Sequence, residues 1–170
     1  EAAALYALTQ DMPSVSGVPA YETRSHARPG DESRHHLTYW RYQDYCGIGP
    51  GAHGRRGGFA TVRHKKPENF LKAVSEKRHG VSEQTLLSTE EQASEALLMG
   101  LRLVEGIDLA DLEARIDKPR RSMVNREALD RYRELGFVWE RDNRIGVEPK
   151  GMGVLNSLIE ILVADSLVPS

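Results

Sequence analysis

Residues 126–147 read REALDRYRELGFVWERDNRIGV, and this stretch decides the fold of the second half of the chain. Its first ten residues carry apolar side chains at helical spacing, which predicts a helix over residues 126–135 that ends at Gly136. The apolar positions of that helix are Ala128, Leu129, Tyr132 and Leu135. Residues 137–147 then alternate apolar and polar side chains around the turn pair Asp142–Asn143. That alternation is typical of a β-hairpin.

Three further helices are expected around this stretch. Overlapping capping boxes within residues 88–92 start one helix, and its apolar face continues until Gly106 ends it. Residues 109–116 form a short helix, and residues 155–162 form a closing one. Helices, a hairpin and a closing helix predict a mainly helical, winged-helix-like domain with a β-hairpin wing over residues 83–170.

A winged helix suggests DNA binding, but the charge of this domain speaks against it. Residues 83–170 hold 11 Lys and Arg against 17 Asp and Glu, a net charge of −6. Arginines cluster around the helix at 126–135, yet Glu127, Asp130 and Glu134 are interleaved with them. Binding the phosphates of DNA requires an excess of cationic side chains. We therefore expect no nucleic-acid partner. DNA binding is kept only as a third functional hypothesis, behind the two given at the end of this section.

The first half of the chain has a different composition. Residues 1–82 hold 12 Lys and Arg against 8 Asp and Glu, a net charge of +4, and they contain all six histidines. This shift predicts a domain boundary near residue 80. Residues 1–10 already follow a helical pattern, which favours the interpretation that the chain is the C-terminal part of a longer protein.

The overall composition is that of a globular protein. Hydrophobic residues make up 39% and charged residues 28% of the 170 residues. No apolar run approaches the roughly 20 residues that a membrane span needs, and no signal-peptide pattern opens the chain. The single cysteine, Cys46, fits a reducing compartment, so we expect a cytoplasmic protein.

The most informative stretch, residues 21–54, reads YETRSHARPGDESRHHLTYWRYQDYCGIGPGAHG. It resembles the HemW-type radical S-adenosylmethionine (SAM) proteins, relatives of oxygen-independent coproporphyrinogen III oxidase. Those proteins carry Tyr-Glu-x-Ser-Asn-x-Ala-Arg-Pro-Gly, then Arg-His-Asn-x-x-Tyr-Trp, then Gly-Ile-Gly-Pro-Gly-Ala-His-Gly. The resemblance covers essentially all of this chain but only the later part of such a protein. Here Arg24-Ser25 stands in place of Ser-Asn, and His36 stands where the family usually has Asn.

The resemblance implies a fold and two cofactors. Residues 1–80 would be the last strands and helices of a partial radical-SAM (β/α) barrel, followed by the helical domain. SAM and a [4Fe–4S] cluster would serve the full-length parent. The family's Cys-x-x-x-Cys-x-x-Cys motif is absent from this chain, so the cluster ligands and the catalytic residues would lie elsewhere. We expect Cys46 to be a small packing residue in a strand over residues 45–49.

The resemblance also implies a haem or porphyrin site before the glycines. Carried over residue by residue, it comprises Arg34, His35, His36, Tyr39 and Trp40. His35 would be the axial ligand of haem iron, and the aromatic side chains would flank the porphyrin face. The alternative is that His35 is a hydrogen-bonded structural histidine.

A second candidate site is the glycine-rich turn, which the resemblance places near SAM and substrate. Its residues are Gly47, Ile48, Gly49, Pro50, Gly51 and His53. Backbone N–H groups at such a turn can face an anionic ligand, although a tight turn without a ligand is an equal alternative. Arginines at 24, 28, 34 and 41 suit porphyrin propionates, since guanidinium groups bind carboxylates in bidentate fashion. Ordinary surface arginines are the alternative.

The leading hypothesis is the C-terminal region of a haem chaperone that passes haem to an acceptor protein. The competing hypothesis is an oxygen-independent coproporphyrinogen III oxidase, which decarboxylates propionates by radical chemistry. The His-x-x-x-Tyr-Trp segment at residues 35–40 favours the chaperone. Without the cluster cysteines, this region would be enzymatically inactive alone.

Overall fold

The computed structural model describes residues 8–9, 15–164 and 167. The chain divides into two compact units, one made of residues 43–88 and the other of the residues up to Tyr42 together with those from Thr89 onward. The predicted division into residues 1–80 and 83–170 stays a prediction. Apart from Leu8 and Thr9, the helix expected over residues 1–10 lies outside the described residues.

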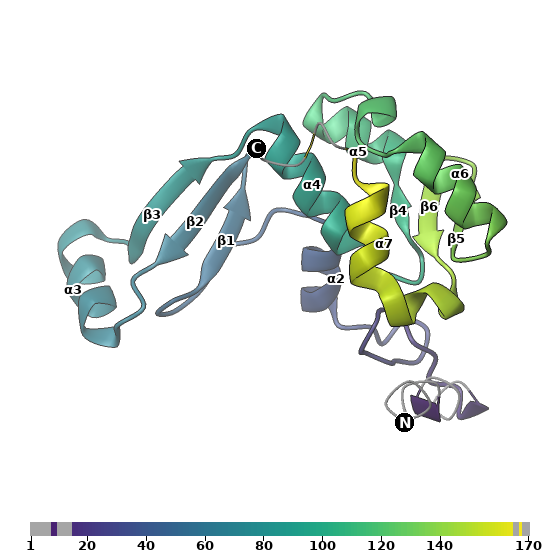
Figure 1. Cartoon of the computed structure of the whole chain (residues 1–170). Helices are drawn as coiled ribbons and strands as arrows, with labels where there is room; N and C mark the ends of the chain where they lie inside the picture. Colours follow the sequence, from purple (N-terminus) through teal and green to yellow (C-terminus); the bar gives the residue numbers. More distant parts are fainter. Residues whose placement is uncertain (1–7, 10–14, 165–166, 168–170) are drawn as a thin grey trace. The chain divides into compact units, whose positions relative to one another are not determined.

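The unit of residues 43–88 is a three-stranded sheet with one helix (Figure 1). Its elements are β1 (His53–Arg56), β2 (Phe59–Arg63), α3 (Pro67–Lys77) and β3 (Val81–Leu86). The strand order is β1-β2-β3, and each pair is antiparallel. Helix α3 begins at Pro67, and Arg78, which follows its last residue, adopts a left-handed conformation. The predicted strand at residues 45–49 is wrong, since only Tyr45 forms an isolated bridge, to Arg55.

This sheet differs from what a barrel fragment leads one to expect. Neighbouring strands of a (β/α) barrel are parallel and joined by helical crossovers. Among the described strands of the chain, every pairing is antiparallel. The structure is mixed α/β, as expected, while the assignment to a barrel stays a prediction.

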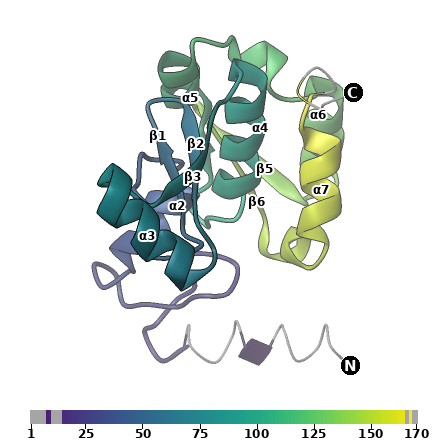
Figure 2. The same ribbon diagram turned by 90° about the vertical axis from the view of Figure 1, so that its left-hand side faces the viewer.

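The other unit is mainly helical and holds a second small sheet (Figures 1 and 2). After α2 (Arg34–Trp40) its elements are α4 (Thr89–Gly100), β4 (Ile107–Asp108), α5 (Leu109–Ile116), α6 (Arg126–Glu134), β5 (Val138–Arg141), β6 (Arg144–Val147) and α7 (Leu155–Leu162), with short 3₁₀ turns at Arg120–Ser122 and Pro149–Val154. The predicted hairpin is β5–β6, and β4 pairs with β6 to give the order β4-β6-β5.

Apolar side chains from all of these helices and strands, other than α2, form the core of this unit. Leu112 of α5, Leu129 of α6 and Leu158 of α7 are almost fully buried. Side-chain caps fix the helix starts: Asp108 accepts hydrogen bonds at the start of α5, and Asn125 accepts one at the start of α6. The core therefore follows the apolar spacing that the sequence shows.

Helix α4 ends earlier than predicted, at Gly100 rather than near Gly106. The reason is pairing with an earlier part of the chain. The N–H of Thr23 donates to the carbonyl of Arg102, and the N–H of Val104 donates to the carbonyl of Tyr21. Backbone groups used in this antiparallel bridge are not available for helical hydrogen bonds.

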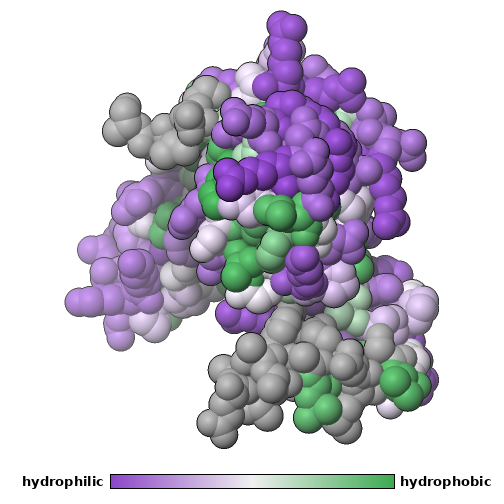
Figure 3. All heavy atoms as spheres, turned by 45° about the vertical axis from the view of Figure 1, so that its right-hand side comes forward, coloured by the Kyte–Doolittle hydropathy of each residue, from purple (hydrophilic) through white to green (hydrophobic). Residues whose placement is uncertain are grey.

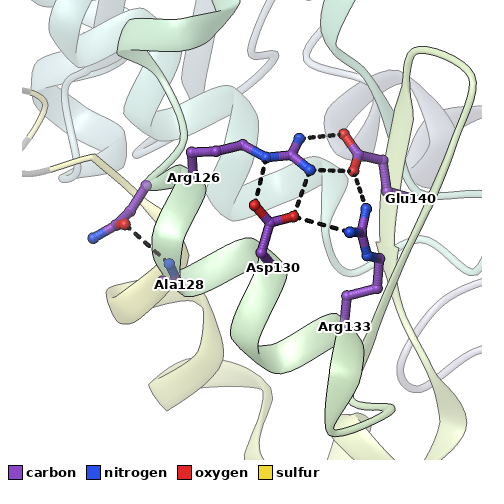
Figure 4. A network of polar contacts seen from close by, with 6 residues as sticks. Arg126, Ala128, Asp130, Arg133 and Glu140 are labelled. Atoms are coloured by element: carbon purple, nitrogen blue, oxygen red, sulfur yellow. Dashed lines mark hydrogen bonds and ion pairs between the residues drawn. The ribbon is translucent and has the colours of Figure 1, made fainter.

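Two arginines of α6, Arg126 and Arg133, are paired with carboxylates (Figure 4). Arg126 contacts Asp130 within the helix and Glu140 on β5, at 2.5 Å and 2.7 Å. Arg133 contacts the same two carboxylates, at 3.0 Å and 2.7 Å. These contacts pair the two guanidinium groups with carboxylates of the same unit.

This network predicts a pH-dependent contribution to stability. Hydrogen bonding from Arg126 lowers the pKa values of Asp130 and Glu140 below their ordinary 3.8 and 4.5. A lowered pKa in the folded state stabilises the fold above the ordinary pKa, and that stabilisation is lost as the pH falls through the folded-state value. We expect Arg126→Gln to destabilise the protein at pH 7 and much less at pH 3, measured by urea unfolding.

Exposed Arg131 on the same helix offers the matched control. The Arg131→Gln variant should differ from wild type by a similar small amount at both pH values. If the deficit of Arg126→Gln were equal at pH 7 and pH 3, the two carboxylates would not be its cause.

Candidate functional site: an aromatic helix beside an arginine-lined pocket

Helix α2 carries all five residues of the predicted haem site. Ser33 caps its start by accepting a hydrogen bond from the N–H of His36. The phenol of Tyr39 lies 2.9 Å from Nε2 of His35, and the two rings meet edge to face at 4.5 Å. His35 is solvent-exposed yet uses Nε2 in this contact. Arg34, at the first position of the helix, is also exposed.

His36 is held differently from His35. Its Nδ1 lies 3.2 Å from the phenol oxygen of Tyr21, a residue before the helix. When one ring nitrogen of a histidine is engaged in this way, the other nitrogen is the one available to a metal or ligand. The structure thus distinguishes the two histidines: Nε2 is engaged in His35, and Nδ1 is engaged in His36.

A pocket of about 940 Å³ opens beside α2. Its lining comprises residues 22–25, His36, Trp40, Arg102 and residues 152–157. The volume lies at the upper end of the range for small-molecule sites. Of the five predicted haem-site residues, His36 and Trp40 line this pocket, whereas Arg34, His35 and Tyr39 do not.

Arg102 was not singled out from the sequence, and the structure places it in the pocket wall. Its guanidinium carbon lies 5.8 Å from the centroid of the Trp40 ring, and Nη2 donates to the amide oxygen of Asn156 at 3.2 Å. Nη1 donates to the carbonyl of Leu98. Burial, and then the positive charge of Arg24, lower the pKa of Arg102, whereas the charge of Glu22 acts in the opposite direction.

Glu22 is the buried charged residue of this pocket, with only 3% of its surface exposed. Its Oε2 accepts hydrogen bonds from the hydroxyl of Thr23 at 3.0 Å and from the N–H of Arg24 at 3.1 Å. The carboxylate thereby fixes the turn that presents Arg24 and Ser25 to the pocket.

The glycine-rich turn belongs to the unit of residues 43–88 and is described within it. A Cβ on Gly47 would lie 2.3 Å from the carbonyl oxygen of His53, so the turn requires glycine there for its own packing. His53 begins β1, and Ile48 is 91% exposed. The role of this turn in binding SAM or substrate stays a prediction. Cys46 is exposed, so its predicted role as a buried packing residue is wrong.

The described residues do not suit an iron–sulfur cluster. Such a cluster needs several thiolates, and the chain has one cysteine. Within the described ranges, no three His, Cys, Asp or Glu side chains come together as metal ligands would. This chain's own residues therefore supply no cluster site.

The surface offers two further observations. Figure 3 shows apolar side chains gathered on one face of the molecule, surrounded by polar ones. The exposed apolar residues include Leu98 on α4, Val154 before α7 and Ile161 on α7. Among the residues that the structure describes, no helix is long and apolar enough to cross a membrane.

Comparisons with known proteins agree with the resemblance. Residues 87–154 match the sequence model of the HemN C-terminal domain. The chain is 34% identical over 105 residues to "Heme chaperone HemW" of Bacillus subtilis, which aligns 62% of this chain with 28% of that protein. It is 27% identical over 164 residues to "Heme chaperone HemW" of Lactococcus lactis, which aligns 96% of this chain with 42% of that protein.

Two other matches come from a mammal and from a solved structure. "Radical S-adenosyl methionine domain-containing protein 1, mitochondrial" of mouse is 37% identical over 114 residues, covering 62% of this chain and 26% of that protein. The solved structure of coproporphyrinogen III oxidase (HemN) from Escherichia coli, a radical SAM enzyme, superposes with a TM-score of 0.64 at 17% identity. It covers 91% of this chain and 39% of that one.

Together these matches first define a class: the chain carries a HemN C-terminal domain and shares its fold with a radical SAM enzyme. Within that class, the chain is similar to the C-terminal part of HemW-like radical SAM proteins. The chain spans about a quarter to two fifths of the length of the relatives described above.

Proposed function

We propose that this chain is the haem-binding C-terminal region of a HemW-like haem chaperone. The observation that supports it most is the placement of two histidines and two aromatic residues on one short helix, beside a pocket of about 940 Å³. Imidazole nitrogen is a common axial ligand of haem iron, and aromatic side chains pack against porphyrin faces.

His36 is the better placed of the two candidate iron ligands. It lines the pocket, and its engaged Nδ1 leaves Nε2 to meet the iron. His35 serves as ligand only if it gives up the contact between its Nε2 and Tyr39, or binds through Nδ1. In this proposal His35 and Tyr39 flank the site, and Trp40 supports the porphyrin.

We also propose two finer assignments of the fold, one for each part of the chain. Residues 89–162 suit a winged-helix-like domain, because helix, short strand, two helices and hairpin follow one another with the sheet order β4-β6-β5. Residues 1–80 are proposed as the last strands and helices of a partial radical-SAM (β/α) barrel. The ligands of a [4Fe–4S] cluster would belong to other parts of the full-length protein, SAM would bind in that protein with the glycine-rich turn nearby, and haem would be its cargo.

The alternative function, oxidation of coproporphyrinogen III propionates, is supported by the likeness to HemN alone. That likeness, at 17% identity, concerns the fold. A direct assay for decarboxylated product with the full-length protein separates the two hypotheses.

Haem titration of the purified protein, followed by its Soret band, tests the proposed function. We expect wild type to bind haem, His36→Ala to weaken binding at least about tenfold, and His35→Ala to have the smaller effect. The double variant should lose the spectral signature of an imidazole-bound iron.

The exposed residue His79, in the unit of residues 43–88, provides a matched histidine control. The His79→Ala variant should bind haem as wild type does. Unchanged binding by His35→Ala, His36→Ala and their combination would show that α2 does not supply the ligand.

A further inference from the structure

One wall of the pocket beside α2 carries charged side chains that binding the iron would not require. Two guanidinium groups, those of Arg24 and Arg102, line one cavity and are close enough for the charge of one to affect the other. The carboxylate of Glu22 offsets only one of these two charges. Like charges held together in a partly buried place favour an anion between them.

The geometry of Arg102 suits a carboxylate ligand. A guanidinium group has five N–H donors in a fixed plane. The two described hydrogen bonds of Arg102 use one nitrogen each, toward Leu98 and Asn156, and hold the group over Trp40. The side chain is thus positioned before a ligand arrives, which lowers the entropy lost on binding.

We infer that this pocket binds the propionate carboxylates of a porphyrin, with Arg102 and Arg24 as their partners and Trp40 beside the ring. This inference rests on the proposed function and names the part of the haem that the pocket recognises. Of these two arginines, only Arg24 was indicated by the sequence. Arg102 is distant from α2 in the sequence and comes close to it only in the folded chain.

The test compares iron protoporphyrin IX with its dimethyl ester, in which both carboxylates are blocked. Wild type should bind the free acid about tenfold more tightly than the ester, in keeping with charge-assisted hydrogen bonds. Arg102→Gln and Arg24→Gln should lose most of that preference. Arg131→Gln, which changes an exposed arginine of α6, should keep it.

A second variant tests the same inference in case Arg102→Gln does not fold. Asn156→Asp retains an acceptor for Arg102 and adds a negative charge to the pocket, so it should weaken free-acid binding about tenfold while the ester is little affected. If wild type binds no porphyrin at all, the proposed function and this inference both fail. If wild type binds both porphyrins equally, or if folded Arg102→Gln and Asn156→Asp keep the preference, this inference alone is overturned.

Discussion

Replacing Gly106 by alanine is expected to destabilise the helical unit by about 3 kcal/mol or more. Gly106 adopts φ of +65°, which costs a residue with a Cβ about 1–2 kcal/mol. A Cβ there would lie 2.2 Å from the carbonyl oxygen of Ile145 and 2.9 Å from the ring of Trp139. Backbone cannot yield as a flexible side chain does, so overpacking of roughly 1–3 kcal/mol is added.

Gly136 provides the matched control, because it has almost the same backbone conformation without the crowding. Its φ is +71°, and a Cβ at this position would have Nζ of Lys150 as its nearest neighbour, at 3.7 Å. Gly136→Ala should therefore show only the conformational cost, about 1–2 kcal/mol. Urea unfolding of both variants measures the difference. Equal losses would mean that the strand β6 gives way to the new methyl group at little cost.

The helices and hairpin of residues 107–162 could be predicted closely, because each carries a local signal. Apolar spacing, caps such as Asn125 and stops such as Gly136 act within a few residues of the element they define. The end of α4 could not be predicted in this way. It depends on pairing between Thr23 and Arg102, which are far apart in the sequence, and no local pattern reports such a contact.

The same limit applies to the candidate site. The resemblance pointed to His35, His36, Tyr39 and Trp40, which stand together in one segment. It did not indicate that His36 rather than His35 lines the pocket, because the pocket also includes Arg102 and residues 152–157, which are distant in the sequence. Cys46 was expected in a strand over residues 45–49, but the pairing of this segment is limited to an isolated bridge at Tyr45, and Cys46 is exposed.

Glu22→Ala is expected to cost about 2–3 kcal/mol of stability, whereas Glu22→Gln should cost less than about 1 kcal/mol. The alanine variant removes the acceptor of two hydrogen bonds, from Thr23 and from the N–H of Arg24, in a place with little access to water. It also leaves the positive charges of Arg24 and Arg102 without the carboxylate that offsets them. Glutamine keeps an acceptor oxygen at the same position.

The two variants also separate the structural role of Glu22 from its charge. If the carboxylate matters as an acceptor that fixes the turn, Glu22→Gln should fold as wild type does in thermal or urea unfolding. Its pocket should nevertheless be more positive, so free-acid porphyrin should bind more tightly than to wild type while the dimethyl ester should not. A glutamine variant as unstable as the alanine variant would mean that the negative charge itself holds Arg24 and Arg102 in place. In that case the pocket keeps its shape only while its positive and negative side chains balance one another. Ligand carboxylates would then have to take the place of the Glu22 carboxylate, instead of binding in addition to it.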